Sequence, residues 1–506
     1  MPSTTTRPDC SPNWWLIAAA ALSVGFLVCR AALQAITIDE ATTFELWVLP
    51  ATPAYWDGAS NNHILNSVLI KLFTSVFGLS HLTMRAAACL GGALFYAGIC
   101  YLAHLLTPHR GLQWIFFVFA GSNPLILDYL VAARGYSLAM AFLVWLFLIP
   151  ARLRQRRGDH VSAQFRSVLL SSLAAGLCIA ANFSFAIMAV VSLLLTMWWT
   201  HRRGRDGANR WRHWGVTLLA GAGPAALVLV LFAGHAVTHW PAGQLWWGAT
   251  STRTMLQTVA EASLYQPNPY VLNPLLLRAV LFLRPLVLPV LCGSLFARVL
   301  VWIRERRTSP VTDWREEFGT VLLGSLAITV FLHWILFRLA QVLLPQERTA
   351  LYIPVVLALF GSVIASIQAS SRAGDLTRKG LIAALAITSV YFLTCVRLSH
   401  FKEWEWGAEV QRAYAVVAAQ AKRHSPAKVA SSWHYATALN FYRQMYGDPF
   451  FETVSNGPPY PANCTIYVVH SAFDKGVIES QKLRIVYSGP LTEMVVAVLP
   501  ETTTAK

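Results

Sequence analysis

Charge is scarce in this sequence. Only 13% of the 506 residues are Asp, Glu, Lys or Arg, whereas 56% are hydrophobic. Soluble domains carry about 25% charged residues, so this composition excludes an ordinary soluble enzyme. The mean hydropathy of +0.49 indicates a polytopic membrane protein instead.

Other familiar signals are missing as well. No Gly-rich loop follows a predicted strand, which argues against a nucleotide-binding motif. Most of the eight cysteines lie in apolar runs, where they behave as small hydrophobic residues, and their spacing suggests neither a disulfide framework nor a metal site. The sequence also shows no internal repeat or low-complexity tract.

Apolar runs of about 20 residues are long enough to cross a bilayer. They predict an all-α membrane bundle of about eleven transmembrane helices. The runs cover residues 13–33, 82–106, 112–130, 135–150, 166–181, 184–200, 215–234, 276–303, 318–342, 350–367 and 381–398. No small-residue cleavage site follows the first run, so we expect a retained span and not a signal peptide. The segment 62–79 is shorter and contains Asn66 and Lys71, which favours a helix lying at the interface.

The net charge of +16 comes from basic residues in short connections between spans. These connections are 152–157, 202–212, 304–307 and 372–379, and all fall on one side if 62–79 does not cross. The positive-inside rule makes this side cytoplasmic. We therefore interpret the surplus charge as topology and expect no nucleic-acid partner.

The composition changes after residue 398. We predict a transmembrane domain over 1–398 and a small soluble α/β domain over 399–506, which an odd number of spans places outside the cytoplasm. Residues 403–424 have an amphipathic helical pattern, 428–433 and 465–470 resemble buried strands, 435–447 a helix, and 482–499 a hairpin. The run Trp433-His434-Tyr435 after the first strand is more typical of packing than of a sugar-binding edge.

Polar side chains recur where spans meet the outer side. Taken singly, each is typical of a solvated anchor, but together they bring carboxylates, cations and neutral hydrogen-bonding groups to one face. Guanidinium groups suit phosphate oxygens, and a carboxylate can accept a proton from an attacking hydroxyl. The residues concerned are Asp39, Glu40, Asn61, Asn62, His63, Lys71, Asp128, Arg134, Tyr136 and Arg348.

The order of these motifs resembles a known family. A DE pair after the first span, then NNHILNSVLIKLFTSVFG, then NPLILDYLVAARGYSL resembles the GT-C class of integral membrane glycosyltransferases. Within that class it is most similar to the bacterial branch related to protein O-mannosyltransferases and to the transferase that adds aminoarabinose to lipid A. The resemblance covers residues 13–200 and, further on, the stretch ERTALYIP.

The resemblance implies a polyprenyl-phosphate sugar as donor and transfer with inversion on the outer face. Asp39 would be the general base, and Glu40 would support it or help position the acceptor. Arg134 and Arg348 would hold the donor phosphate, with Lys71 as a third cation.

Asn62, His63, Asp128 and Tyr136 are candidate substrate-binding residues. Many relatives carry His-Pro-Pro where this chain has Asn62, His63 and Ile64, which leaves the role of His63 and the identity of the acceptor open. We expect no cofactor. The need for a divalent ion stays open: oxygen ligands suit Mg²⁺ or Mn²⁺, but two adjacent carboxylates without further ligands make a poor site. The sugar also stays open.

Two other classes compete with this interpretation. A transporter or lipid flippase also needs many spans, but such proteins tend to show repeated halves and ionisable groups at the midplane. Here the charges lie at span ends. The other class is a membrane scaffold whose catalytic site has decayed, although such a site would be free to lose Asp39, Arg134 and Arg348.

Overall fold

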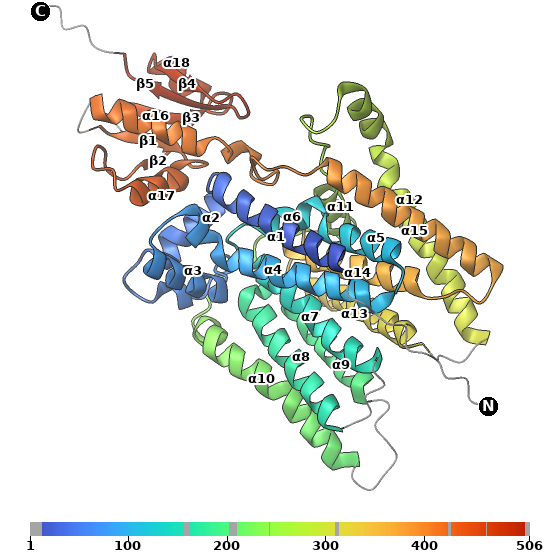
Figure 1. The fold of residues 1–506 in the computed structure, drawn as a ribbon. Helices are drawn as coiled ribbons and strands as arrows, with labels where there is room; N and C mark the ends of the chain where they lie inside the picture. Colours follow the sequence, from blue (N-terminus) through green and yellow to red (C-terminus); the bar gives the residue numbers. More distant parts are fainter. Residues whose placement is uncertain are drawn as a thin grey trace, which may run out of the picture.

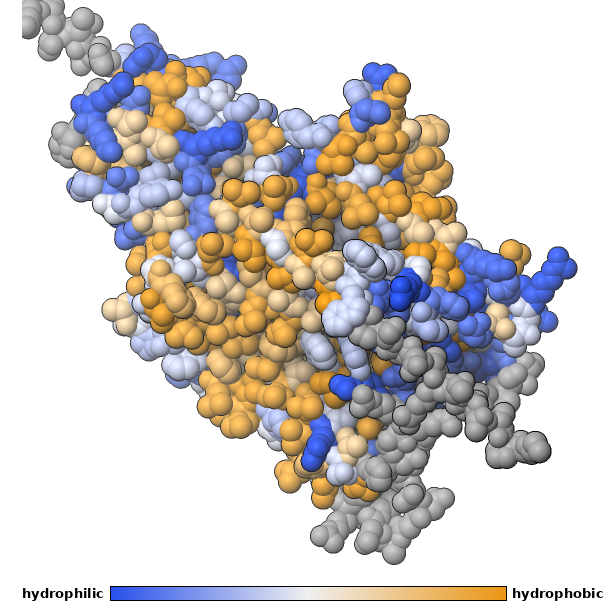
Figure 2. All heavy atoms as spheres, in the orientation of Figure 1, coloured by the Kyte–Doolittle hydropathy of each residue, from blue (hydrophilic) through white to orange (hydrophobic). Residues whose placement is uncertain are grey.

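The structure is a computed structural model that describes residues 13–155, 161–201, 210–241, 243–308, 313–423, 427–461 and 463–500. Within these ranges, ten helices are long and apolar enough to cross a membrane. The chain is therefore a multi-pass membrane protein, as its composition predicts. In Figure 2 a broad apolar surface lies between hydrophilic surfaces at the two ends of the molecule. The ten helices are α1 (Trp14–Leu33), α4 (His81–Leu106), α7 (Tyr136–Gln155), α8 (Val161–Ala181), α9 (Ala186–His201), α10 (Arg210–Thr238), α12 (Pro274–Thr308), α13 (Trp314–Ala340), α14 (Tyr352–Ser366) and α15 (Arg372–Thr394).

The predicted span 112–130 is two helices, α5 (Arg110–Gly121) and α6 (Pro124–Tyr129). The prediction of a single helix over these residues was therefore wrong. Proline has no backbone N–H and is favoured in the first turn of a helix. The Asn123 side chain accepts hydrogen bonds from the N–H groups of Leu125 and Ile126, so a new helix starts at this point. The short α6 leads directly into the loop that carries Arg134.

Hydrogen bonds between connections show which helix ends lie together. Asn13 donates to Gln113 at 2.7 Å, and Arg315 donates to the carbonyls of Leu106 and Ser366 at 3.1 Å each. Glu305 accepts from Ser371 at 2.7 Å at this same end of the bundle. We call it the basic end, because the described parts of the arginine-rich connections meet here. The predicted basic stretches 156–157 and 202–209 lie outside the described residues.

The opposite end, called the carboxylate end, holds the segment between α1 and α4. It contains α2 (Ile38–Thr43), the π-helix η1 (Phe44–Val48), the 3₁₀ turn η2 (Ala54–Trp56) and α3 (Ile64–Phe77). Near the start of α3, Asn66 donates to the Ala133 carbonyl at 3.0 Å; at its far end, Gly78 accepts from Thr83 at 2.8 Å. The helix α3 therefore begins and ends at the carboxylate end, which agrees with an interfacial helix that does not cross.

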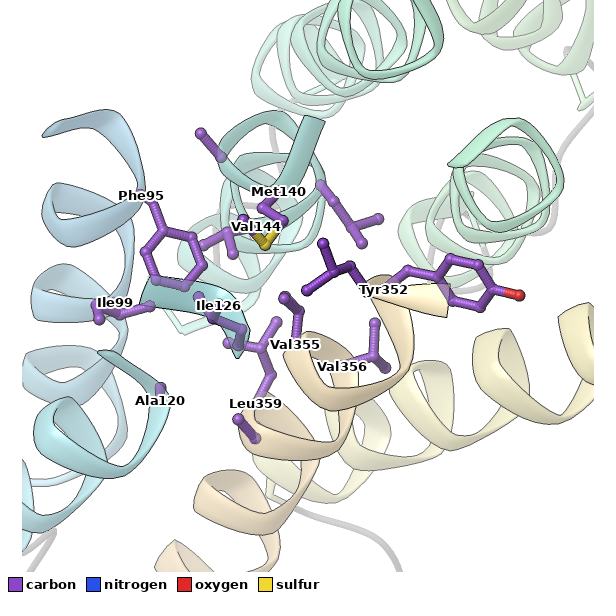
Figure 3. Close-up of a cluster of buried hydrophobic side chains, with 14 of the residues drawn as sticks. Phe95, Ile99, Ala120, Ile126, Met140, Val144, Tyr352, Val355, Val356 and Leu359 are labelled. Carbon is purple, nitrogen blue, oxygen red and sulfur yellow. The ribbon is translucent and has the colours of Figure 1, made fainter. Parts of the chain in front are cut away.

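Apolar packing fixes the middle of the bundle. Phe95 and Ile99 of α4, Ile126 of α6, Val144 of α7 and Leu359 of α14 are at most 3% exposed and meet in one cluster (Figure 3). Within a membrane, close van der Waals packing holds such a cluster together, because lipid tails are as apolar as these side chains. Because α6 and α7 are both held in this cluster, the loop between them has a fixed position.

The C-terminal domain contains a five-stranded sheet in the order β2-β1-β3-β5-β4. Strands β2, β1 and β3 are parallel, whereas β5 is antiparallel to β3 and to β4. The structure confirms the predicted strands and the helix over 435–447, whereas the helix predicted over 403–424 begins only at Val410, after the 3₁₀ turn η5 (Glu405–Gly407); β2 and α18 were not predicted. The elements are α16 (Val410–Arg423), β1 (Val429–Ser432), α17 (Ala436–Tyr446), β2 (Ser455–Gly457), β3 (Ile466–His470), α18 (Lys475–Ser480), β4 (Arg484–Ser488) and β5 (Met494–Val498).

This domain packs on the carboxylate end of the bundle (Figure 1). The Tyr442 hydroxyl of α17 accepts a hydrogen bond from the N–H of Ile36 at 3.0 Å and lies 3.0 Å from a ring nitrogen of His81. The rings of Phe44 and Phe441 meet edge to face at 5.3 Å. These contacts hold the segment after α1 against the C-terminal domain. Asp39 and Glu40 therefore lie where the helix bundle and the C-terminal domain meet.

Candidate active site

The centre of the site is one carboxylate shared by two guanidinium groups. Arg348 donates to Oδ2 of Asp39 at 2.8 Å, and Nε of Arg134 lies 4.0 Å from the same oxygen. Asp39 is 17% and Arg348 24% exposed at the side chain, whereas Arg134 is 1% exposed. Three residues separated by more than 90 positions in the sequence thus meet in one place that keeps an opening to solvent.

Arg134 is held in place by its other nitrogens. It donates to the Thr43 hydroxyl at 3.0 Å, to the Asp39 carbonyl at 3.3 Å and to the side-chain oxygen of Asn61. Within the described part of the chain, no atom forms a hydrogen bond with its Nε. A buried donor without a partner is costly and calls for an explanation. This N–H is available to an anion that enters the site.

The turn ARGY explains how Arg134 reaches this position. Gly135 has a φ of +72°, a conformation that residues with a side chain rarely adopt. A Cβ on this glycine would also lie 2.2 Å from the carbonyl oxygen of Ala181. The chain therefore turns sharply against the end of α8, and α7 starts at Tyr136.

Glu40, adjacent to Asp39, has a different environment. It is fully buried, and Arg85 forms a bidentate pair with it at 2.8 and 2.6 Å. The N–H groups of Thr37 and Ala133 donate to its two oxygens at 2.9 and 2.8 Å. Burial alone would raise the pKa of Glu40, but the Arg85 charge and these hydrogen bonds outweigh burial and hold the pKa below its ordinary value. Both oxygens are occupied, so the carboxylate fixes the loop geometry.

Arg85 completes this clamp. Besides Glu40, its guanidinium donates to the carbonyls of Ala31, Gln34 and Ala35 at distances of 3.0, 2.7 and 2.8 Å. The last turn of α1 is thereby tied to α4, and Glu40 ties α2 to the loop before Arg134. The Glu40–Arg85 pair positions the residues on either side of it, Asp39 and Arg134.

His63 faces the two cations without a bonded partner. It is 4% exposed, and its ring packs edge to face on Tyr136 at 5.2 Å. Neither ring nitrogen forms a hydrogen bond with any described residue. Burial lowers the pKa of His63 well below its ordinary value, and the charges of Arg134 and Arg348 lower it further. The imidazole is therefore neutral near pH 7 and can accept or donate one hydrogen bond.

Lys71 and Asn62, which were also predicted for the site, have different surroundings. Lys71 donates to the carbonyls of Val48 and Pro50 at 2.6 and 3.3 Å. Asn62 is fully buried. Its side-chain N–H donates to the carbonyl of Asp57, and its side-chain oxygen accepts from the Ser67 hydroxyl. These contacts hold the loop between η1 and α3, and they give Lys71 and Asn62 a place in its architecture.

Asp128 joins segments that are far apart in the sequence. It forms a buried pair with Arg30 at 2.5 Å and accepts from the Tyr265 hydroxyl at 3.2 Å. The N–H groups of Lys402 and Glu403 also donate to it, at 2.9 and 3.2 Å. Asp128 therefore ties α1, the connection before α12 and the segment after α15 together beside the site.

Glu403 belongs to the site region and was not singled out from the sequence. The hydroxyls of Tyr129 and Tyr265 donate to it at 3.2 and 3.4 Å. Burial, with smaller contributions from Glu347 and Asp128, raises the pKa of Glu403 to about 7 against the opposing effect of Arg348. The sequence signal was the run EWEW directly after the last span, which we assigned to an amphipathic helix.

Arg348 is framed by two further groups that the sequence left unassigned. Its guanidinium lies over the ring of Trp247 at 5.9 Å. The preceding Glu347 has a φ of +44°, a strained conformation for a residue with a side chain. Such strain costs about 1–3 kcal/mol and tends to occur at functional sites. The short turn η4 (Glu347–Ala350) therefore presents Arg348 at a cost to local stability.

The site suits an anion better than a metal. It offers two guanidinium groups, one neutral imidazole and one carboxylate. Within the described ranges, no group of three or more His, Cys, Asp or Glu side chains could hold a metal ion. A phosphate could take the free N–H of Arg134 and compete with Asp39 for Arg348.

Comparisons with known proteins complete the description. No family model matches the sequence, and no curated protein matches it. Among solved structures, ArnT from Cupriavidus metallidurans in the apo state matches 96% of this chain and 98% of its own, at 14% identity and a TM-score of 0.44. Arabinofuranosyltransferase AftD from Mycobacteria matches 96% of this chain and 41% of its own, at 13% identity and a TM-score of 0.45.

A third solved structure is the Archaeoglobus fulgidus oligosaccharyltransferase in complex with Zn and sulfate. It matches 92% of this chain and 69% of its own, at 13% identity and a TM-score of 0.44. The function below is argued from the geometry of the site.

Proposed function

We propose that this protein transfers a sugar from a polyprenyl-phosphate donor to an acceptor hydroxyl, with Asp39 as the general base. The observation that carries the proposal is the meeting of Asp39, Arg134 and Arg348 at one opening, with 2.8 Å between Asp39 and Arg348. A carboxylate and two guanidinium groups at this spacing supply both charges that displacement of a sugar phosphate needs.

In the proposed reaction, Asp39 takes the proton of the acceptor hydroxyl as its oxygen attacks the anomeric carbon. The bond between that carbon and the phosphate oxygen breaks, and the negative charge on the departing polyprenyl phosphate is held by Arg134 and Arg348. Attack opposite the leaving group inverts the anomeric centre. General-base assistance contributes about 10²- to 10⁴-fold, and preorganised cations at the leaving oxygen contribute a comparable factor.

The remaining residues have supporting roles in this proposal. Glu40, Asn62, Lys71 and Asp128 hold the loops that carry the reacting groups. His63, neutral and without a bonded partner among the described residues, faces the phosphate or the sugar. Tyr136 forms part of the aromatic wall beside it.

The bilayer also has a part. A donor anchored by its polyprenyl tail arrives at the carboxylate end already oriented, which lowers the entropic cost of bringing the reactants together. The basic end faces the cytoplasm by the positive-inside rule, so transfer takes place on the extracytoplasmic side. The proposal also includes an inner-membrane location in bacteria, which is what the resemblance of the motifs to a bacterial branch implies.

Replacing Asp39 by Asn tests the role of the base. Membranes containing the wild-type chain or D39N are supplied with a radiolabelled undecaprenyl-phosphate sugar, and transfer to cell-envelope material is followed over time. We expect a loss of about 100-fold or more in turnover, because the amide cannot accept the proton. The matched control is Asp57→Asn, which changes an exposed carboxylate at the same end of the bundle.

Two results would contradict the proposal. Unchanged turnover in D39N would remove Asp39 as the base. Movement of the labelled lipid across the membrane by the wild-type chain, without formation of a new glycosidic bond, would favour a flippase.

A further inference from the structure

An exposed aromatic cluster lies on the C-terminal domain, away from the Asp39 site. Trp433 is 53% and Phe473 is 74% exposed. Between them lie two imidazoles: His434 stacks on Trp433 at 3.7 Å, and His470 stacks on Phe473 at 4.2 Å. His434 and Phe473 are also nearly parallel, with an angle of 16° between the rings. Trp433 is thus only half covered, which differs from the packing role expected from the sequence.

The topology of the sheet explains why these side chains meet. Trp433 and His434 directly follow β1. His470 is the last residue of β3, and Phe473 comes shortly after it. The connection after β1 leads to β2 on one side, whereas the connection after β3 leads to β4 and β5 on the other side, so β1 and β3 form a switch point. In open sheets, the crevice beyond the carboxyl ends of the strands at such a switch point is where ligands bind. The cluster occupies this place in the C-terminal domain.

Hydrogen-bonding groups surround the rings. The Ser432 hydroxyl lies 3.0 Å from Nδ1 of His434. Glu493, at the start of β5 on the same edge, lies 3.7 Å from Nδ1 of His470 and is 61% exposed. Asp474 is buried and accepts from the Tyr460 hydroxyl at 2.8 Å. The edge therefore combines flat apolar rings with imidazole and carboxylate groups.

This chemistry selects among ligand classes. Phosphates and nucleic acids require cations, and no Arg or Lys takes part in the ring contacts or hydrogen bonds described for this edge. A saccharide has both features that the edge matches: C–H groups that pack on the electron-rich face of an aromatic ring, and hydroxyls that bond imidazole and carboxylate groups.

Aromatic rings also connect this edge with the reaction site. Trp406 lies 5.2 Å from His434 and 6.5 Å from Trp433. It follows Trp404, whose ring packs on Tyr129 at 5.2 Å, and Tyr129 packs on Tyr136 at 4.8 Å. The short segment 403–406 thus joins Glu403, beside Arg348, to the edge of the sheet.

We infer that the carboxyl edge of β1 and β3 binds a glycan chain through Trp433 and Phe473, and that this glycan is the acceptor which the site at Asp39 extends or modifies. The acceptor role rests on the proposed function, whereas binding of the glycan does not. The bound chain lies along Trp433, His434 and Trp406, which directs one end of it towards Tyr129 and Asp39.

Binding is tested on the full-length chain in detergent with no donor present. Fluorescently labelled hexasaccharides of glucan, mannan, galactan and arabinan are the probes, and affinity is read from fluorescence anisotropy. We expect wild type and Asp39→Asn to bind at least one of them equally. Trp433→Ala and Phe473→Ala are each expected to bind it roughly tenfold more weakly, since each removes one stacking surface.

Tyr446→Ala is the matched control. Tyr446 is an aromatic residue of the same domain with 52% exposure, and it ends α17 at the opposite edge of the sheet from Trp433. The Tyr446→Ala variant should bind the hexasaccharide with the same affinity as wild type.

Three outcomes would overturn the inference: no binding of any hexasaccharide by wild type, unchanged affinity in both Trp433→Ala and Phe473→Ala, or a fall in their thermal midpoints large enough to show that the rings support packing. If the edge binds a glycan but D39N keeps full transfer activity, the binding site stands and the proposed reaction fails.

Discussion

Arginine is used differently at the two ends of the bundle. At the carboxylate end Arg30, Arg85 and Arg134 are at most 1% exposed, and each bonds a carboxylate or a backbone carbonyl. At the basic end Arg152 and Arg304 are exposed to solvent, with Arg298 a buried exception paired with Glu305 at 3.1 Å. The same residue type is therefore buried and bonded at one end and mainly exposed in the connections at the other.

The pair Asp39 and Glu40 repeats this contrast on a smaller scale. Glu40 has four hydrogen bonds from Arg85, Thr37 and Ala133 and is fully buried. Asp39 has one hydrogen bond from Arg348 and keeps some exposure. A saturated carboxylate can position its neighbours, whereas one with free acceptor capacity can take part in chemistry.

The largest effect on stability is expected from breaking the buried pair. Arg85→Met leaves Glu40 charged and buried without its cation, which costs about 3–5 kcal/mol. Thermal unfolding of the purified protein in detergent, followed by intrinsic fluorescence, measures the change. The matched change at the other end, Arg304→Met, removes an exposed charge and should alter stability by no more than about 0.5 kcal/mol.

A second substitution sharpens this test. Adding Glu40→Gln to Arg85→Met removes the unpaired charge and keeps an acceptor for one of the two N–H groups of Thr37 and Ala133, which bond different oxygens of Glu40, so part of the loss should be recovered. Equal thermal midpoints for Arg85→Met and Arg304→Met would show that the buried pair does not hold this end together.

The next effect concerns the turn before α7. Gly135→Ala forces a side chain into a positive φ and against the Ala181 carbonyl, at a cost of about 2–3 kcal/mol. Gly111→Ala is the control at the basic end, because a Cβ there meets no atom within 4 Å and alanine favours a helix. We expect Gly135→Ala to lower the thermal midpoint and Gly111→Ala to keep or raise it. A neutral result at Gly135 would contradict the close approach to α8.

The smallest effect is a pH dependence at the carboxylate end. The pKa of Glu403 is raised to about 7 in the folded protein, so folding favours its protonated form. The stabilisation is complete below the unfolded pKa of about 4.3, and it is lost as the pH rises through 7. Wild type should therefore be less stable at pH 8 than at pH 5.5 by about 1–2 kcal/mol through this group.

Glu403→Gln should remove that part of the pH dependence, whereas Glu479→Gln, at an exposed carboxylate, should keep it. Thermal midpoints measured across this pH range decide the matter. An identical slope in wild type and Glu403→Gln would show that another group titrates.

The site was partly predictable from the sequence. The motifs around Asp39, Arg134 and Arg348 stood out because polar residues near a membrane need a partner or a use. Their different roles did not stand out: Glu40 and Asp128 are as polar as Asp39, and only contacts from distant segments show that their oxygens are occupied. Glu403 was missed because its unusual pKa comes from burial beside Glu347 and Asp128, which are far from it in the sequence.

The sequence by itself determined most of the membrane-embedded helices, four of the five strands of the C-terminal domain and the segregation of basic residues, because each follows from local hydrophobic period, length and composition. Tertiary structure decided which carboxylate is free, how 112–130 breaks into two helices and that Trp433 lies exposed at a switch point. These depend on burial, and on hydrogen bonds from segments that lie far apart in the chain.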